Sequence, residues 1–211
     1  MRVKAFPALV PGPGLAAPLA SVPYDVINTE EARALAGDNP RSFLRVERAE
    51  LELPAETDPY SAEVYAHAKA NFEKFQREGF LVRESEPCVY LYRQVMDGRA
   101  QTGIALACHI EDYENDLIRK HEKTRKVKED DRTRLTDVLS ANTGPVFLTY
   151  KDAAAIDAFV VGWSAEHEST IDFIDDVGVG HTVWRVAESE AQPLLAALGE
   201  VPLSYVADGH H

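Results

Sequence analysis

Short β-rich runs alternate along this chain with segments whose apolar residues repeat at helical spacing. The strongest helical pattern covers residues 60–78 and stops at Gly79, a residue type that commonly ends helices. The strongest strand pattern covers residues 88–110, which we expect to form a hairpin around the two-residue turn Asp97-Gly98. This alternation predicts an α/β fold, of the α+β type with a mixed sheet.

The other segments are shorter, and their patterns predict a further set of elements. Helices are expected at residues 29–37, 126–140, 153–163 and 188–198, and strands at residues 3–10, 42–46, 145–150, 170–174, 181–186 and 203–207. Residues 11–23 are rich in Pro, Gly and Ala and are expected to form a loop. We predict two regions: residues 1–115 form an N-terminal α/β region that contains the long helix and the hairpin, and residues 116–211 form the second region.

Charge and cysteine content restrict the class of protein and partner. The formal net charge is −13 over 211 residues, so the surface repels phosphate backbones and we expect no DNA or RNA binding. The two cysteines stand far apart in apolar runs, which argues against a disulfide framework. The sequence shows neither a secretory signal pattern nor an apolar run of about 20 residues. We therefore expect a cytoplasmic protein without a membrane partner.

The last predicted strand leads directly into Asp208, Gly209, His210 and His211. Polar residues at the carboxyl end of a strand lie where α/β proteins bind ligands, and a glycine lets the backbone approach a ligand closely. The two histidines add hydrogen-bond donors or metal ligands. The alternative is a disordered tail or the remainder of a cloned tag, but a tag does not explain the apolar strand before it.

A second candidate is the His121-Glu122 pair in the loop before the helix at residues 126–140. Glu122 is a candidate general base or metal-binding carboxylate, and Thr124 is a candidate cap for the helix that follows. No histidine lies four residues after His121, so this is not the zinc motif with two histidines on one helix. The alternative is a solvated loop that carries these side chains by chance.

Two weaker candidates come from other segments. Tyr24 and Asp25 follow a flexible loop and could fold over a site, although Asp25 is equally typical of a turn or a cap. Arg132 lies in a charged run on the predicted helix after Glu122, and it is a candidate phosphate clamp if that helix lines the site. Otherwise this run is a solvated helix face.

Several of these residues also carry a resemblance to a known family. The segments Val22-Pro-Tyr-Asp-Val-Ile27, Asn39-Pro-Arg-Ser-Phe43, Tyr90-Leu-Tyr-Arg-Gln94, His121-Glu-Lys-Thr124, Asn142-Thr-Gly-Pro-Val-Phe147 and Ala207-Asp-Gly-His-His211 occur in this order. Together they resemble the bacterial family known as domain of unknown function 1015 (DUF1015). Its members are about twice as long and continue past the Asp-Gly-His-His with an arginine, which implies that this chain is an N-terminal fragment.

A more distant resemblance connects the chain to the ParB/sulfiredoxin superfamily, which includes free-serine kinases. Those kinases have a His-Glu loop, a helix, a strand and then an Asp-Gly-His motif that opens a helix. The resemblance implies a ParB/sulfiredoxin-like core with an N-terminal extension and an inserted helix-hairpin-helix between Phe147 and the motif. It also implies Glu122 as the catalytic base beside His121, and residues 208–211 as the loop that holds nucleotide phosphates. The arginine of those kinases has no counterpart in this chain.

Three functions from different classes remain open on the sequence. The first is a phosphotransferase that uses ATP or ADP with Mg²⁺ on a small metabolite, with Glu122 as base, Arg132 and residues 208–211 around the phosphates, and Tyr24, Asp25 and Thr124 toward the substrate. The second is a non-catalytic, ParB-like module that holds a nucleotide and regulates partners. The third is a metal-dependent hydrolase whose ligands come from His121, Glu122, His210 and His211. The sequence does not determine the oligomeric state.

Overall fold

The computed structural model describes residues 1–210, which divide into two compact units. Unit 1 comprises residues 1–9, 83–123 and 146–210, and unit 2 comprises residues 10–82 and 124–145. The boundary that the sequence suggested after residue 115 falls within the middle segment of unit 1. Each unit is therefore assembled from stretches that lie far apart in the sequence.

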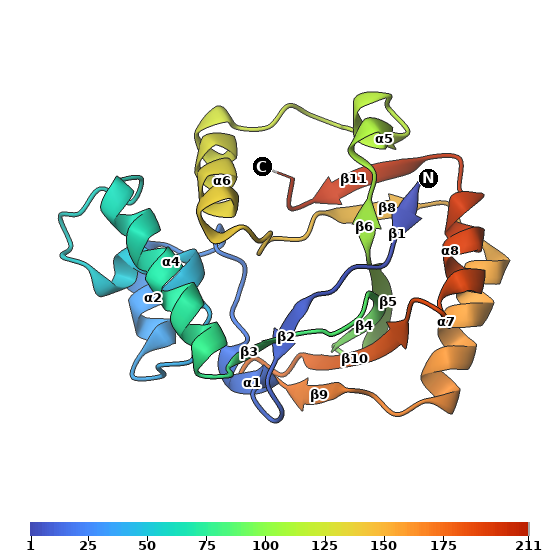
Figure 1. Cartoon of the computed structure of the whole chain (residues 1–211), viewed down its shortest axis with the longest axis horizontal. Helices are drawn as coiled ribbons and strands as arrows, with labels where there is room; N and C mark the ends of the chain where they lie inside the picture. Colours follow the sequence, from blue (N-terminus) through green and yellow to red (C-terminus); the bar gives the residue numbers. More distant parts are fainter. Residues whose placement is uncertain (211) are drawn as a thin grey trace. The chain divides into compact units, whose positions relative to one another are not determined.

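The larger sheet of unit 1 is antiparallel and has the strand order β5-β4-β10-β9 (Figure 1). Strands β4 (Cys88–Met96) and β5 (Arg99–Ala105) form the predicted hairpin. Asp97 and Gly98 both have positive φ, at 51° and 75°, as the favoured two-residue hairpin turn requires. Strands β9 (Ile171–Ile174) and β10 (Gly180–Ala187) form a second hairpin that pairs with the first through β4 and β10.

The core of unit 1 lies between this sheet and two helices, α7 (Ala154–Glu166) and α8 (Gln192–Gly199). Alternate residues of β4 and β10 point into it and meet side chains from both helices. Its largest fully buried side chains are those of Val89, Leu91, Ile156, Val186 and Leu194. Burial of each such side chain contributes about 1.5–3 kcal/mol. The segment that the resemblance treats as an insertion is thus an integral part of this core.

A smaller sheet of unit 1 has the order β7-β11-β8. Its strands are β7 (Ile118–Arg119), β8 (Phe147–Tyr150) and β11 (Ser204–Asp208). The central strand β11 runs parallel to β7 and antiparallel to β8. Unit 1 also contains the short pair β1 (Val3–Lys4) and β6 (Ala107–Cys108), and helix α5 (Ile110–Glu114).

Unit 2 is mainly helical. Its helices are α1 (Ala16–Leu19), α2 (Thr29–Ala36), α3 (Leu44–Glu47), the 3-10 turn η1 (Ala49–Glu52), α4 (Ala62–Arg77) and α6 (Lys126–Leu139). Helix α4 contacts α3, η1 and α6. Its buried side chains repeat at helical spacing, as the sequence predicted, and they include Phe72 and Phe75. Strands β2 (Leu9–Pro11) and β3 (Leu81–Arg83) pair in a two-stranded sheet.

Four local predictions were wrong or incomplete. The single strand expected at residues 3–10 is divided into β1 and β2, which belong to different sheets. Residues 42–46 were expected to form a strand, but they lead into helix α3, which Arg45 ties to the carbonyl groups of Asn39 and Gly37 at 2.8 and 2.7 Å. The loop expected at residues 11–23 contains the one-turn helix α1. Arg125, and not Thr124, is the N-cap residue of α6; the Thr124 hydroxyl donates to the carboxylate of Glu129 instead.

The structure confirms the general fold class, because it is a mixed α/β arrangement with several small sheets, most of them antiparallel. Within residues 1–210, no helix is both long enough and apolar enough to cross a bilayer. Cys88 and Cys108 are both free thiols, and Cys88 is fully buried in unit 1.

Candidate functional site

Parallel pairing of β7 with β11 brings two distant loops of unit 1 to one sheet edge. Ser204 pairs with Ile118 and Tyr205 with Arg119. In a parallel pair the carboxyl ends of both strands point the same way. The loop after β7, which begins near His121, and the loop after β11, which begins at Gly209, therefore leave the sheet side by side.

The ring of His121 is oriented by the backbone of β11. Its Nδ1 lies 3.1 Å from the carbonyl oxygen of Val206. A carbonyl only accepts, so Nδ1 carries the hydrogen and Nε2 of the neutral ring presents its lone pair away from the strand. This is the arrangement by which proteins orient histidines that bind metals.

Glu122 and His210 complete a compact group with His121. Glu122 Oε1 lies 3.4 Å from His210 Nε2 and 3.7 Å from His121 Nε2. The two imidazole rings have their centroids 5.1 Å apart. The His210 side chain is only 5% exposed, whereas those of His121 and Glu122 are both 52% exposed. The group is thus anchored on its buried side and open to solvent on the other.

The turn that delivers His210 depends on the residues before it. Asp208 ends β11, and its Oδ1 accepts a hydrogen bond from the amide of Gly209 at 2.8 Å. Gly209 has φ +69°, in the left-handed region where side chains other than glycine cost energy. This turn points the chain back toward the loop that carries Glu122.

The donor set and its spacing suit a transition-metal ion. The three ligand atoms all lie within 4.8 Å of one another. Two ligands at about 2.1 Å from a shared tetrahedral ion are roughly 3.4 Å apart, close to the separations of Glu122 from the two rings. Two imidazoles and one carboxylate favour zinc and its neighbours over magnesium, which prefers oxygen ligands.

A comparison with protein-family models matches residues 3–211 to the family described as "Protein of unknown function (DUF1015)". The chain belongs to the DUF1015 family. This confirms the resemblance seen in the sequence motifs. Searches of curated proteins and of solved structures found no match, so the chemistry of this DUF1015 chain is inferred from its own residues.

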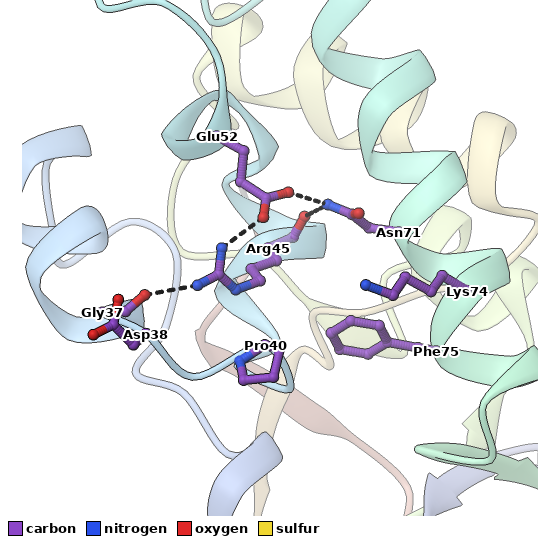
Figure 2. A pocket seen from close by; sticks show the side chains of 8 residues that line it. All are labelled: Gly37, Asp38, Pro40, Arg45, Glu52, Asn71, Lys74 and Phe75. Carbon is purple, nitrogen blue, oxygen red and sulfur yellow. Dashed lines mark hydrogen bonds and ion pairs between the residues drawn. The ribbon is translucent and has the colours of Figure 1, made fainter.

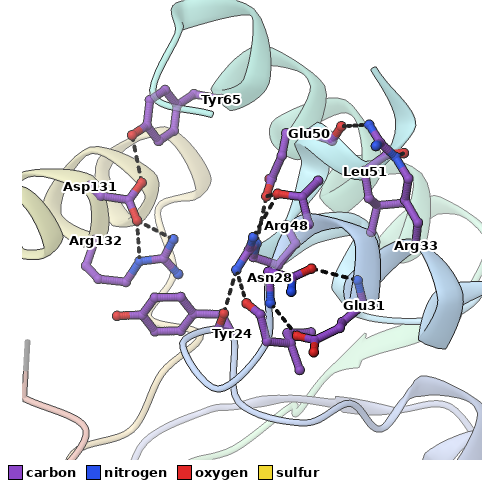
Figure 3. Close-up of polar contacts among 12 residues, drawn as sticks. Tyr24, Asn28, Glu31, Arg33, Arg48, Glu50, Leu51, Tyr65, Asp131 and Arg132 are labelled. Atoms are coloured by element: carbon purple, nitrogen blue, oxygen red, sulfur yellow. Dashed lines mark hydrogen bonds and ion pairs between the residues drawn. The ribbon is translucent and has the colours of Figure 1, made fainter. Parts of the chain in front are cut away.

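The remaining predicted residues of the DUF1015 chain lie in unit 2, except His211, which is outside the described residues. Tyr24 lies against Arg132, whose Cζ is 3.8 Å from the centroid of the tyrosine ring (Figure 3). Asp25 is exposed in the turn that follows, and Thr124 is bonded to α6. The roles predicted for these residues remain predictions.

Polar residues of unit 2 that sequence reasoning missed surround this Tyr24–Arg132 pair. Asp131 accepts a hydrogen bond from the Tyr65 hydroxyl at 2.7 Å and two from the Arg132 guanidinium at 2.7 and 3.0 Å (Figure 3). Glu47, at the end of α3, is 91% buried (9% exposed) and lines the same cavity. The sequence pattern places Asp131 in a solvated run, and nothing in that pattern distinguishes it from the neighbouring acids.

A larger hollow of about 420 Å³ in unit 2 is lined by α3, α4 and the turn after α2 (Figure 2). The groups around it bond mainly with one another. Arg45 donates to Glu52 at 2.5 Å and to the carbonyl of Gly37 at 2.7 Å, and Asn71 donates to Glu52 at 2.7 Å. This mutual pairing indicates a structural network that fixes α3 against α4.

Proposed function

We propose that the chain is a metal-dependent enzyme of the hydrolase class, with its metal centre on His121, Glu122 and His210 of unit 1. The observation that carries the proposal is that His121, Glu122 and His210 each bring one ligand atom to one sheet edge, and these atoms all lie within 4.8 Å of one another. Two histidines and a glutamate are the ligand set of several zinc hydrolases.

Each residue has a separate task in this proposal. His121, held by the Val206 carbonyl, and the buried His210 provide two fixed nitrogen ligands. Glu122 provides the carboxylate, and its half-exposed side chain leaves space for water and a substrate group on the solvent side. A bound divalent metal ion would polarise a substrate carbonyl or phosphoryl group and lower the pKa of water.

Metal analysis of the purified protein tests this proposal. We expect about one equivalent of a transition metal after dialysis, or its uptake when zinc, manganese or cobalt is added to chelator-treated protein. His210→Ala and Glu122→Gln should reduce the metal content strongly. His167→Ala and Glu114→Gln make the same changes at exposed positions of unit 1 outside the cluster, so these variants should retain the full metal content. Full metal content in the His210 and Glu122 variants, or none in the parent, contradicts the proposal.

A second candidate is a phosphotransferase that uses ATP or ADP with Mg²⁺ on a small metabolite. One observation favours it: the Asp208–His210 turn lies beside Glu122. The resemblance to free-serine kinases implies the same two motifs, a His-Glu loop and an Asp-Gly-His turn, in this order along the chain. Here Glu122 acts as a base toward the substrate hydroxyl, and the backbone turn at Gly209 approaches the phosphates. Asp208 or Glu122 would be the carboxylate that holds Mg²⁺.

Nucleotide assays separate the two candidates. Binding of ATP or ADP by calorimetry, with turnover that requires magnesium and is lost in Glu122→Gln, supports the phosphotransferase. The matched Glu114→Gln variant should keep full turnover. Binding without turnover supports instead a regulatory, ParB-like module. Absence of nucleotide binding, together with a retained transition metal, leaves the hydrolase.

A further inference from the structure

Unit 2 contains a small cavity of about 90 Å³ bounded by α3, η1, α4 and α6. Its polar walls include Glu47. They also include Tyr24, Arg48, Asp131 and Arg132, which Figure 3 shows. At about 10–15 Å³ for each water, this space holds roughly six to nine water-sized groups. That is the size of a very small polar metabolite.

Most charges around the cavity are compensated within the protein. Asp131 receives hydrogen bonds from Tyr65 and Arg132. Arg48 donates to Glu50 at 2.7 Å and to the backbone carbonyl groups of Tyr24 and Ile27 at 2.8 Å (Figure 3). These contacts assemble the walls and do not call for a ligand.

Glu47 is the first exception. The residue is 9% exposed, and its Oε1 is buried without a hydrogen-bond partner. Burial raises the pKa of its carboxyl, and a hydrogen bond with Thr143 and the charge of Arg132 offset only part of that rise. A buried carboxylate oxygen without a partner costs a folded protein several kcal/mol in general, so such an atom calls for an explanation.

Arg132 is the second exception. Its Nε and Nη2 donate to Asp131, but Nη1 is buried without a hydrogen-bond partner. Its guanidinium stacks on the Tyr24 ring, which fixes its plane. Arg132 and Glu47 influence each other electrostatically but form no ion pair with each other. Glu47 and Arg132 both line the cavity, and each carries one buried polar atom without a hydrogen-bond partner, an acceptor on the acid and a donor on the base.

We propose that this cavity binds a small α-amino acid, with its ammonium on Glu47 Oε1 and its carboxylate on Arg132 Nη1. A zwitterion compensates both groups at once. A lone anion would pair with Arg132 but would approach the buried Glu47 carboxylate, and a lone cation would approach the guanidinium. The cavity volume restricts the side chain to a few heavy atoms. This inference concerns unit 2 alone and does not depend on the metal centre of unit 1.

Isothermal titration calorimetry of the whole chain with glycine, alanine and serine tests the proposal. We expect saturable binding of at least one of them. Ethylamine, which lacks the carboxylate, and propionate, which lacks the ammonium, should each bind at least about tenfold more weakly, because each leaves one buried charge unpaired. Binding of either single-charge analogue as tightly as the amino acid overturns the proposal, as does failure of all three amino acids to bind.

Two variants test the residues directly. Glu47→Gln preserves the shape of the side chain and removes its charge, so affinity should fall at least about tenfold. Glu63→Gln makes the same change at an exposed position of α4 and should have no effect. Arg132→Lys should weaken binding of the amino acid, with folding checked by circular dichroism. If this variant unfolds, the ethylamine measurement still tests the carboxylate contact. Unchanged affinity in Glu47→Gln overturns the assignment.

Discussion

Replacing Tyr65 by Phe removes one buried hydrogen bond of unit 2 and little else. The Tyr65 side chain belongs to α4 and is 4% exposed, and its hydroxyl donates to Asp131 Oδ1 at 2.7 Å. Burial and the hydrogen bond to this carboxylate raise the pKa of Tyr65, so the phenol remains a donor across the ordinary pH range. The ring that packs in the helix interface is the same in both residues.

The expected loss of stability follows from the partners that remain. A hydrogen bond to a charged acceptor contributes about 1.5–3 kcal/mol. Asp131 is 8% exposed, and it retains two bonds from Arg132 on its other oxygen, so it does not become an unpaired buried charge. We therefore expect a loss of about 1.5–3 kcal/mol, and not the larger penalty of a broken buried ion pair.

Urea denaturation followed by circular dichroism at helical wavelengths measures this loss, because unit 2 is mainly helical. With a slope of about 2 kcal/mol/M the midpoint should fall by on the order of 1 M. Both tryptophans, Trp163 and Trp184, lie in unit 1, so their fluorescence reports that unit. Tyr60→Phe is the matched control at a partly exposed position. Equal midpoints for the Tyr65 and Tyr60 variants would refute the reasoning.

Three further outcomes test other parts of the structure. Asn28→Ala removes the side chain that accepts from the Glu31 amide in the capping box of α2, so it should cost about 1 kcal/mol in circular-dichroism-monitored unfolding. Gly98→Val should destabilise unit 1 by roughly 1–2 kcal/mol, because Gly98 has φ 75°, a conformation that valine adopts at a cost. Gly162→Ala in helix α7 should stabilise unit 1 by about 0.5–1 kcal/mol, because an added Cβ meets nothing within 4 Å. Unfolding followed by tryptophan fluorescence measures both changes, and a change of the same sign in both variants contradicts the argument. Glu47→Gln should raise the stability of unit 2 more at pH 7 than at pH 4. Burial raises the pKa of the Glu47 carboxyl, so the folded state holds this proton more tightly than the unfolded state and loses stability as the pH rises through the shifted range. An equal gain in stability at both pH values would contradict this reasoning.

Strong local signals predicted much of the secondary structure. Helix α4 and the β4–β5 hairpin were located within a few residues, because helical periodicity and the Asp97-Gly98 turn act within a short stretch of chain. The Asn28 cap of α2 follows from the same kind of local chemistry. The sequence pattern misplaced a strand at residues 42–46 because a short apolar run has no clear period. Hydrogen bonds from the Arg45 side chain to carbonyl groups six and eight residues earlier accompany the helix that forms instead.

The candidate functional residues also divide into those that the local sequence pattern indicated and those that depend on tertiary contacts. Local pattern indicated His121, Glu122 and the Asp-Gly-His turn as chemically active types. It gave no sign of Glu47, whose importance depends on burial, or of the Val206 carbonyl, which orients His121 through the backbone and not through a side chain. Tyr24 and Arg132 were both selected from the sequence, but their contact with each other was not predicted.

By itself, the sequence determined the alternation of helices and strands, the acidic charge, the family and the residue types able to do chemistry. Tertiary structure decided which of those residues meet. His121 and His210 come together because β7 pairs in parallel with β11 across more than eighty residues of intervening chain. Chain entropy opposes the closure of so long a loop until the core forms, so burial in the whole unit decides whether these strands pair. The pattern of residues within either strand therefore does not predict the pairing.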